Sequence, residues 1–156
     1  MTKLIIQIPC YNEERTLGTT LEALPRHLEG IDIIEWLIID DGSTDKTVEV
    51  AKAYGVDRIV RFPTNRGLAK AFMAGLEASI KAGADIIVNT DADNQYCAED
   101  IPKLIEPILL GRAEIVVGAR PIFKIKHFSP IKKLLQKFGS WVVRLASSTD
   151  IPDAPS

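Results

Sequence analysis

Several features that would indicate a particular class of protein are absent from this 156-residue chain or scarce in it. Two cysteines, Cys10 and Cys97, are too few for a disulfide framework and are not spaced as zinc ligands. Lysine and arginine (19) nearly balance aspartate and glutamate (21), so we expect no nucleic-acid partner. No apolar run approaches the ~18 residues that span a bilayer. Because the first residues also lack the layout of a signal peptide, we expect a cytoplasmic protein.

Two common nucleotide-binding motifs are also missing. No G-x-G-x-x-G follows the first apolar segment, which argues against a dinucleotide site, and no G-x-x-x-x-G-K-[ST] occurs, which argues against a P-loop NTPase. The two histidines, His27 and His127, are not placed to activate Cys10 or to bind zinc. The composition is otherwise that of an ordinary globular protein, with 46% hydrophobic and 26% charged residues.

Short β-rich apolar segments alternate along the chain with segments of helical periodicity. The predicted strands are 4–8, 35–40, 58–62, 85–90 and 114–118, and the predicted helices are 13–24, 45–54, 67–82 and 98–110. Strands separated by helices of this size form right-handed βαβ units. The sequence therefore predicts an α/β fold, a three-layer α/β/α sandwich with a mainly parallel central sheet.

The segments that follow the five predicted strands are rich in acids and amides. They are 9–14, 40–45, 63–67, 91–95 and 119–120. In a parallel sheet these segments meet at one edge, which predicts a binding site there. The first three also have a purely structural interpretation: Asn12 is a favourable helix N-cap, 41–43 can form a turn before another cap, and 65–67 can form a turn that opens a helix.

Asp91 and Asp93 give the strongest functional signal. Two carboxylates two residues apart, directly after a buried strand, repel each other unless a cation binds between them. Hard divalent cations such as Mg²⁺ or Mn²⁺ prefer oxygen ligands and bridge substrate phosphates. Arg66 and Arg120 can add positive charge, so a nucleotide diphosphate is the simplest ligand that uses charges of both signs.

Five motifs in this order resemble those of the inverting glycosyltransferases of family 2, which have the GT-A fold with a Rossmann-like nucleotide-binding half. The motifs are I-P-C-Y-N-E-E (8–14), I-D-D-G-S-T-D (39–45), N-R-G-L-A-K-A (65–71), D-A-D-N-Q (91–95) and V-G-A-R (117–120). The D-A-D-N-Q form and a later segment from Asp150 to Ser156 are most similar to the branch that contains dolichyl-phosphate mannose synthase and the polyprenyl-phosphate glycosyltransferases.

The resemblance implies a role for each matching position. The residues implied to hold the nucleoside are Pro9, Tyr11, Glu13, Ile39 and Asp41, with Asp41 near the base. The residues implied to hold the diphosphate and its metal are Asp91, Ala92, Asp93 and Gln95, with Asp91, Asp93 and Gln95 as metal ligands. Arg120 and Lys133 are implied to meet the diphosphate or the acceptor phosphate, and Asp91, Asp93 and Arg120 form the implied catalytic set.

The function implied by this resemblance is inverting transfer of a hexose from a UDP- or GDP-sugar to a polyprenyl or dolichyl phosphate, assisted by Mg²⁺ or Mn²⁺. Two alternatives stay open at the level of sequence. One is a truncated, non-catalytic nucleotide-binding module, since the family continues beyond the position of Ser156. The other is a receiver-type signalling domain that binds Mg²⁺, although no predicted strand ends in the lysine that such a domain needs.

Charge divides the chain into two predicted parts. Residues 1–120 carry a net −6 and form the expected nucleotide-sugar-binding domain, whereas residues 121–156 carry +4 and form a basic loop and helix at the start of the acceptor or membrane-proximal part. From Pro130 to Leu145, apolar residues follow a helical stripe with lysines on the opposite face. Such a helix either faces the core or lies in a membrane interface, which would give the protein a peripheral location on the cytoplasmic face of the membrane.

Overall fold

A computed structural model describes residues 1–118 of the chain, and those from Met1 to Glu114 form one compact unit. Parallel strands alternate with helices, as the periodicity predicts. In chain order, the elements are β1 (Lys3–Cys10), α1 (Leu17–Ala23), β2 (Ile33–Asp40), α2 (Thr47–Ala53), β3 (Arg58–Arg61), α3 (Leu68–Lys81), β4 (Ile86–Asn89), the short 3-10 helix η1 (Ala98–Asp100) and α4 (Ile101–Leu109).

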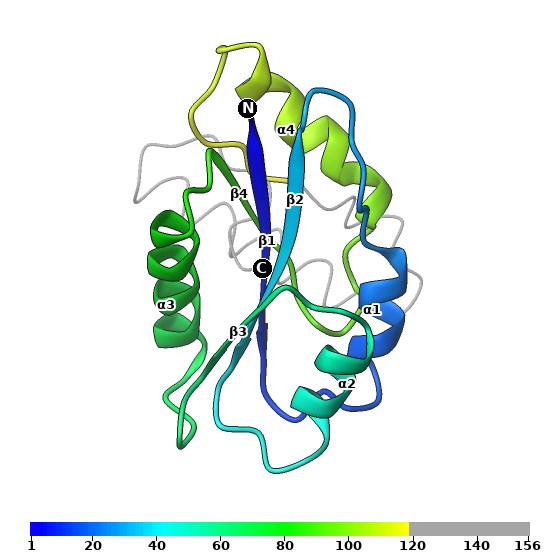
Figure 1. Cartoon of the computed structure of the whole chain (residues 1–156), viewed down its shortest axis with the longest axis vertical. Helices are drawn as coiled ribbons and strands as arrows, with labels where there is room; N and C mark the ends of the chain where they lie inside the picture. Colours follow the sequence, from blue (N-terminus) through cyan, green and yellow to red (C-terminus); the bar gives the residue numbers. More distant parts are fainter. Residues whose placement is uncertain (119–156) are drawn as a thin grey trace, which may run out of the picture. The chain divides into compact units, whose positions relative to one another are not determined.

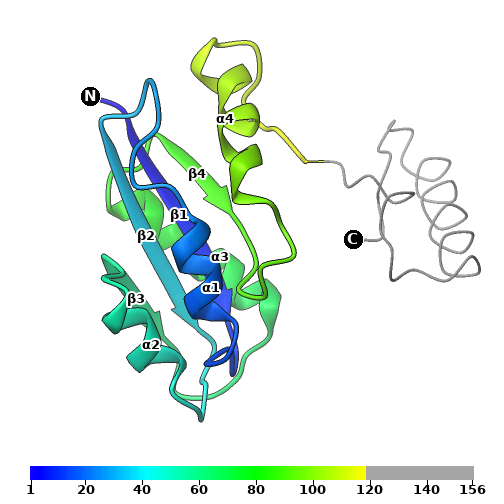
Figure 2. The ribbon, with the colours of Figure 1, turned by 90° about the vertical axis from the view of Figure 1, so that its right-hand side faces the viewer.

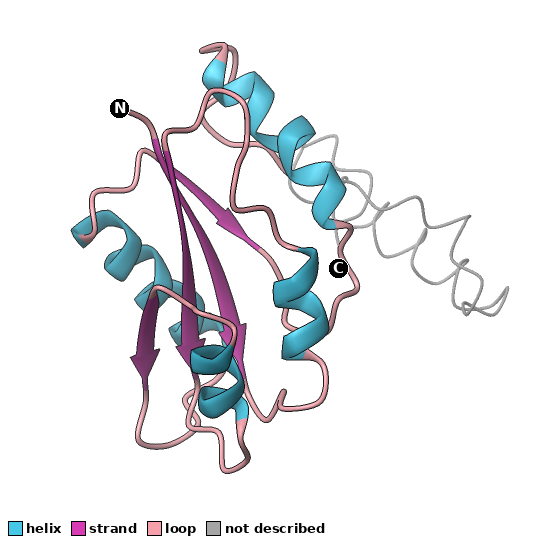
Figure 3. Ribbon diagram, turned by 45° about the vertical axis from the view of Figure 1, so that its right-hand side comes forward, coloured by secondary structure: helices cyan, strands magenta, loops and turns pink. Residues whose placement is uncertain are grey.

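The sheet of the described residues has four strands in the order β3-β2-β1-β4. All of its neighbouring strands pair in parallel, and β1 is paired on both sides, along its full length with β2 and over Leu4–Gln7 with β4. The arrowheads in Figure 3 therefore point in one direction. The chain adds β2 and β3 on one side of β1 and then returns to place β4 on the other side, so the strand order reverses between β1 and β4.

Helices cover both faces of this sheet and bury a core on each (Figures 1 and 2). On the face of α1, α2 and α4, the apolar side chains of β1 and β2 pack against residues such as Leu17, Leu21 and Ile105. On the face of α3, Ile5, Leu37 and Ile39 pack against Ala71. Because both faces are covered, β1 is apolar almost throughout rather than alternating. The predicted α/β class with its α/β/α layers is confirmed.

α3 approaches the sheet so closely that one of its positions requires glycine. A Cβ atom at Gly75 would lie 2.4 Å from the Oε1 atom of Gln7 and 2.7 Å from the Cδ1 atom of Ile39. Both of these side chains are fully buried, so neither can move away cheaply. The small residue therefore allows α3 to lie this close to β1.

Most predicted limits agree with the structure within two residues, and the helix predicted at 98–110 begins with the 3-10 turn η1. Two predicted elements differ by more. The first helix begins at Leu17 rather than at residue 13, because the residues before it are bonded to a neighbouring loop. The predicted strand at 114–118 is wrong, since no strand is assigned there and Ile115 and Val117 are 83% and 80% exposed. A segment forms a strand only by pairing with another strand, and within residues 1–118 no segment pairs with the second edge of β4.

Candidate functional site

The reversal of strand order between β1 and β4 coincides with a cleft at the carboxyl ends of the strands. In open α/β sheets this is the usual place for a ligand, because adjacent connections leave to opposite faces and separate there. The cleft has a volume of about 340 Å³. Its lining residues are Pro9, Cys10, Tyr11, Glu13, Asp41, Asn65, Gly67, Leu68, Ala71, Asp91, Ala92 and Asp93.

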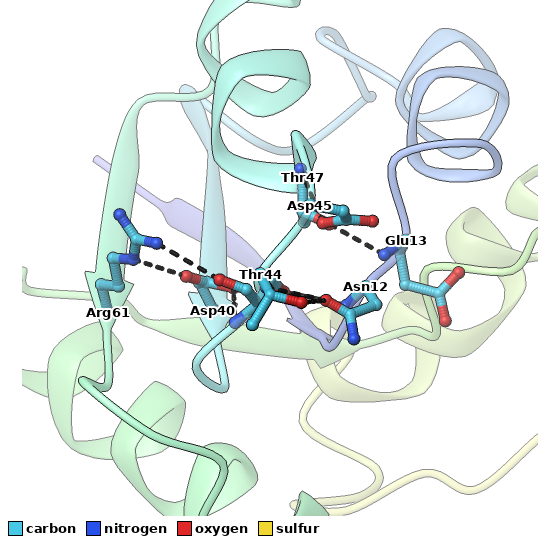
Figure 4. A network of polar contacts seen from close by, with 8 residues as sticks. Asn12, Glu13, Asp40, Thr44, Asp45, Thr47 and Arg61 are labelled. Atoms are coloured by element: carbon cyan, nitrogen blue, oxygen red, sulfur yellow. Dashed lines mark hydrogen bonds and ion pairs between the residues drawn. The ribbon is translucent and has the colours of Figure 1, made fainter.

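The loops that follow β1 and β2 are bonded to each other over several residues. The backbone N–H groups of Asn12 and Glu13 donate to the hydroxyls of Ser43 and Thr47, at 2.9 and 2.8 Å. The side-chain oxygen of Asn12 accepts a 2.8 Å bond from the N–H of Thr44, part of the network in Figure 4. Asn12 adopts φ +58°, a conformation that asparagine tolerates better than most residues. Asn12 is therefore not a helix cap, and the capping interpretation of this residue is wrong.

An ion pair between a buried carboxylate and an exposed guanidinium fixes the start of the second loop. Asp40 is fully buried at the end of β2, and its carboxylate lies 2.9 Å from the Nε atom of Arg61, its register partner on β3. The other carboxylate oxygen of Asp40 accepts the N–H of Ser43 at 3.0 Å, and Arg61 also donates to the Ser43 carbonyl at 3.3 Å. Figure 4 shows Arg61 and Asp40 at one end of this network. One guanidinium thus neutralises Asp40 and holds the turn that carries Asp41.

The carboxylate of Asp41 joins the second loop to the start of α3. Its two oxygens accept the backbone N–H groups of Arg66 and Gly67, at 2.7 and 2.8 Å, and its side chain is almost completely buried. The loops after β2 and β3 approach each other so closely that a Cβ atom at Gly42, where φ is +76°, would lie 2.5 Å from the carbonyl carbon of Thr64. Only glycine fits this position without displacing backbone. Asp41 therefore forms part of the cleft wall and also sets the position of the first residues of α3.

The loop after β4 presents its two aspartates to the cleft on either side of a buried alanine. The side chain of Ala92 is 4% exposed and packs in the core, whereas Asp91 and Asp93 are partly exposed and line the cleft. The carbonyl of Ala92 accepts a buried 2.8 Å hydrogen bond from the hydroxyl of Thr20 on α1. Asp93 accepts the N–H of Gln95 at 3.1 Å, and Asn94 between them has φ +57°. Ala92 thus contributes as an anchor of the loop.

The donor groups of the cleft fit a divalent cation that is shared with a phosphate ligand. Four carboxylates line it, from Glu13, Asp41, Asp91 and Asp93, and no lysine or arginine of residues 1–118 does. Of these carboxylates, those of Asp91 and Asp93 lie on the same loop, two residues apart, and could hold a metal together. No group of three or more Asp, Glu, His or Cys residues within 1–118 is arranged to enclose a metal. Two carboxylates leave coordination positions for water and phosphate oxygens, as Mg²⁺ and Mn²⁺ prefer.

The other predicted site residues lie apart from this set or outside the described residues. Ile39 is fully buried in the core beneath α3, so its side chain does not reach the cleft. Gln95 is exposed at the end of the acidic loop and is not among the lining residues. Arg120 and Lys133 lie outside residues 1–118.

Two lining residues from the first turn of α3, Leu68 and Ala71, lie in the N-R-G-L-A-K-A motif, but no role was predicted for either of them from the sequence. They reach the cleft because Asp41 holds the start of their helix against the second loop. Cys10 also lines the cleft, where burial raises the pKa of its thiol. Its thiol donates to the carbonyl of Ile8 at 3.4 Å. This thiol is a poor nucleophile, since thiolate formation is suppressed.

Residues 5–144 match the family described as Glycosyl transferase family 2. The chain is 32% identical to the UDP-N-acetylglucosamine–dolichyl-phosphate N-acetylglucosaminyltransferase of Methanococcus voltae, over 96% of this chain and 65% of that protein. It is 33% identical to the dolichol-phosphate mannosyltransferase of Pyrococcus furiosus (92% and 41% covered) and 28% identical to the undecaprenyl-phosphate mannosyltransferase of Micrococcus luteus (97% and 63% covered). The chain therefore spans less than two thirds of the length of each of these relatives.

Solved structures of glucosyl-3-phosphoglycerate synthase from Mycobacterium tuberculosis share the fold. The complex with Mn²⁺, UDP and glucosyl-3-phosphoglycerate superposes with a TM-score of 0.57 at 28% identity, covering 69% of this chain and 40% of that one. The complex with Mn²⁺, UDP-glucose and phosphoglyceric acid gives a TM-score of 0.58 at 28% identity, covering 70% and 40%. The predicted GT-A fold is thereby confirmed.

Proposed function

Since the chain belongs to glycosyltransferase family 2, we propose that its cleft binds the nucleotide diphosphate of an activated hexose, UDP- or GDP-linked, and that the protein transfers this hexose. The observation that carries the proposal is the convergence of Asp41, Asp91 and Asp93 on one cleft at the reversal of strand order. These residues come from loops that are fifty positions apart in the sequence. A structural role for each loop taken separately does not require them to share a cavity.

Asp91 and Asp93 are the residues proposed to hold Mg²⁺ or Mn²⁺ together with the diphosphate. Gln95, the third ligand that the resemblance implies, is left out of this set because it does not line the cleft. A bound divalent cation supplies charge neutralisation at the diphosphate and stabilises the departing nucleotide as a Lewis acid. Pro9, Tyr11 and Glu13 form the wall next to β1 and are proposed to contact the nucleoside. The complexes of the mycobacterial synthase with Mn²⁺ and UDP support this assignment of ligand class.

The proposed acceptor is a polyprenyl or dolichyl phosphate. Support comes from the names of three relatives, which act on dolichyl or undecaprenyl phosphate. A phosphate oxygen is already anionic at neutral pH, because its second pKa is about 6, and it needs no general base to attack the anomeric carbon. Attack from the side opposite the leaving diphosphate inverts that carbon. Arg120 and Lys133 are proposed to meet the diphosphate or the acceptor phosphate.

Calorimetric titration of UDP, GDP and ADP with and without Mn²⁺ tests donor binding. We expect UDP or GDP to bind only with Mn²⁺, and Asp93→Ala to abolish this binding because one of the two carboxylates proposed to hold the metal is lost. Asp93→Asn, which keeps the shape of the side chain, should weaken it by roughly tenfold or more. Glu29→Gln is a charge-matched control, since Glu29 is exposed in the connection from α1 to β2 at the opposite edge of the sheet.

Equal binding with and without Mn²⁺, or an unchanged affinity in both Asp93 variants, would contradict the proposed site. The receiver-type alternative is not favoured, because the four described strands end at Cys10, Asp40, Arg61 and Asn89 and none of them ends in lysine. A short phosphodonor that labels an aspartate of the protein would revive it.

We further propose contact with the membrane surface through the basic segment 130–145. The proposal rests on the net +4 of residues 121–156 and on the lipid-linked acceptors of the relatives. Among residues 1–118, no helix has the length and apolar character needed to cross a bilayer. In a flotation experiment with liposomes containing anionic lipid, the full-length protein should be recovered in the lipid fraction at low salt. At about 0.5 M salt a smaller fraction should float, because the electrostatic attraction is screened. Failure to float at low salt would remove this proposal.

A further inference from the structure

We propose that Thr20 is the positioning residue of the acidic loop, and that its hydroxyl holds Asp91 and Asp93 in the geometry that binds the metal. The inference rests on the proposed function of that loop. Thr20 lies on α1, 72 positions from the residue that it bonds. It lies outside the five motifs of the chain and does not line the cleft.

The hydrogen bond from Thr20 to Ala92 is the contact that carries the inference. The hydroxyl donates to the Ala92 carbonyl at 2.8 Å, and both residues are buried, at 3% and 4% exposure. The carbonyl of Thr16 is a longer alternative acceptor at 3.5 Å. A hydroxyl has one proton, and the shorter contact within a buried environment is the stronger bond. Removing it leaves a carbonyl in the interior without this partner, which is costly where water is excluded.

The geometry of the loop explains why this bond acts on the two aspartates. Ala92 is the residue between them, so fixing its carbonyl and burying its methyl group fixes the backbone from which both carboxylates project toward the cleft. At the β4 end, the N–H of Thr90 donates to the Gln7 carbonyl at 3.1 Å. At the other end, the N–H of Gln95 donates to Asp93. Thr20 supplies the anchor in the middle, from a different element.

The sequence of α1 is consistent with this role. The helix has seven residues, L-G-T-T-L-E-A, and contains glycine and two threonines, which are poor helix formers. A Cβ atom at Gly18 would lie 3.0 Å from the hydroxyl of Tyr54, a tight contact with the end of an exposed side chain. Thr19 is exposed, whereas Thr20 directs its hydroxyl into the interior toward the acidic loop. Thr20 thus lies in a helix that its intrinsic propensity does not favour, and its side chain makes a tertiary hydrogen bond there.

Three variants test the inference in the full-length protein. Thr20→Val removes the hydroxyl and keeps the shape, Thr20→Ser keeps the hydroxyl, and Thr19→Val is the matched control on the exposed face of the same helix. The first measurement is hydrogen exchange of the amides of residues 91–95 without nucleotide or metal. The second is the affinity for Mn²⁺ in the presence of saturating UDP or GDP, by calorimetry.

We expect Thr20→Val to speed exchange in residues 91–95 about tenfold relative to the core strands and to weaken Mn²⁺ binding about tenfold, as loss of one buried hydrogen bond predicts. Thr20→Ser and Thr19→Val should stay within about twofold of the wild type. A merely structural role would lower the unfolding temperature and raise exchange throughout the sheet without a selective effect on this loop. If Thr20→Val does not fold, Thr20→Ala is compared with Thr20→Ser in the same way.

Unchanged loop exchange and Mn²⁺ affinity in a folded Thr20→Val would overturn the inference, as would equal effects of Thr20→Val and Thr20→Ser. If Asp93→Ala abolishes binding and Thr20→Val does not alter it, the proposed function stands and the role of Thr20 fails. If the wild type binds neither nucleotide with Mn²⁺, the proposed function fails, and exchange alone decides whether Thr20 orders the loop.

Discussion

At the scale of single residues, the neighbouring acids Asp40 and Asp41 have different roles, although one ends β2 and the other follows it directly. Asp40 points away from the cleft and is paired with Arg61, while Asp41 lines the cleft and accepts two backbone amides. An isolated buried charge is unfavourable, and the pair with Arg61 is what makes a fully buried Asp40 tolerable. The pair of acids therefore combines a structural carboxylate with a site carboxylate.

This division predicts a specific pattern of rescue. Arg61→Met leaves Asp40 as an unpaired buried carboxylate and should lower the free energy of unfolding by about 3 kcal/mol. Asp40→Asn in the Arg61→Met background removes the charge but keeps an oxygen that can accept the N–H of Ser43, so it should restore much of this loss. Urea denaturation of the wild type, both single variants and the double variant measures the coupling. Additive effects of the two substitutions would show that the ion pair is not what holds this turn.

At the scale of elements, two ion pairs of Glu35 connect the strands at the edge of the sheet opposite the cleft. Glu35 of β2 lies between β1 and β3, with one carboxylate oxygen 2.8 Å from Lys3 and the other 2.6 Å from Arg58. The hydrogen bond from Arg58, followed by that from Lys3, outweighs desolvation and lowers the pKa of Glu35 below its ordinary value of 4.5. Glu35 thus links β1, β2 and β3 at a position away from the cleft.

The lowered pKa makes part of the stability depend on pH. Glu35 binds a proton more weakly in the folded than in the unfolded protein, so its contribution is present above the ordinary pKa and is lost as the pH falls through the folded pKa. Glu35→Gln should therefore lower the free energy of unfolding by about 1–2 kcal/mol at pH 7 and by progressively less below about pH 4.5. Urea denaturation of the wild type and of Glu35→Gln at pH values from about 3 to about 7 measures this difference in the free energy of unfolding, with Glu29→Gln as the control. A difference that does not depend on pH would contradict the assignment.

At the scale of the whole molecule, the contacts that stabilise residues 1–114 and the residues that line the cleft lie in different parts of the fold. Strand ladders and two apolar cores occupy the middle, the Glu35 ion pairs lie at the amino edge, and the loops of the cleft lie at the carboxyl edge. The loops after β1, β2 and β4 are each bonded to another loop or helix, in addition to the hydrogen bonds within them. This arrangement allows carboxylates to be concentrated at one edge without weakening the sheet, and it is consistent with a site that is completed by a cation and a diphosphate.

The amino-acid sequence alone determined the architecture of the described part and the place of its cleft. Apolar strands that alternate with helical periods specify a covered parallel sheet, because such strands can bury both faces only under helices. The polar segments that follow the strands are then brought to one edge by topology, so Asp41, Asp91 and Asp93 could be placed together before any coordinates. Helix and strand limits such as those of α3 and β4 followed within a residue or so, since glycines and polar residues flank them.

Only the tertiary structure decided how the loops are held. The contacts that hold the loops connect residues far apart in the chain. They are the bonds before the start of α1, the amide bonds of Asp41, the pair of Asp40 with Arg61 and the bond from Thr20 to Ala92. The need for glycine at position 75 depends on how closely a helix approaches the sheet. Local propensity and periodicity do not predict such contacts, because the geometry of the contacts exists only after the layers have packed.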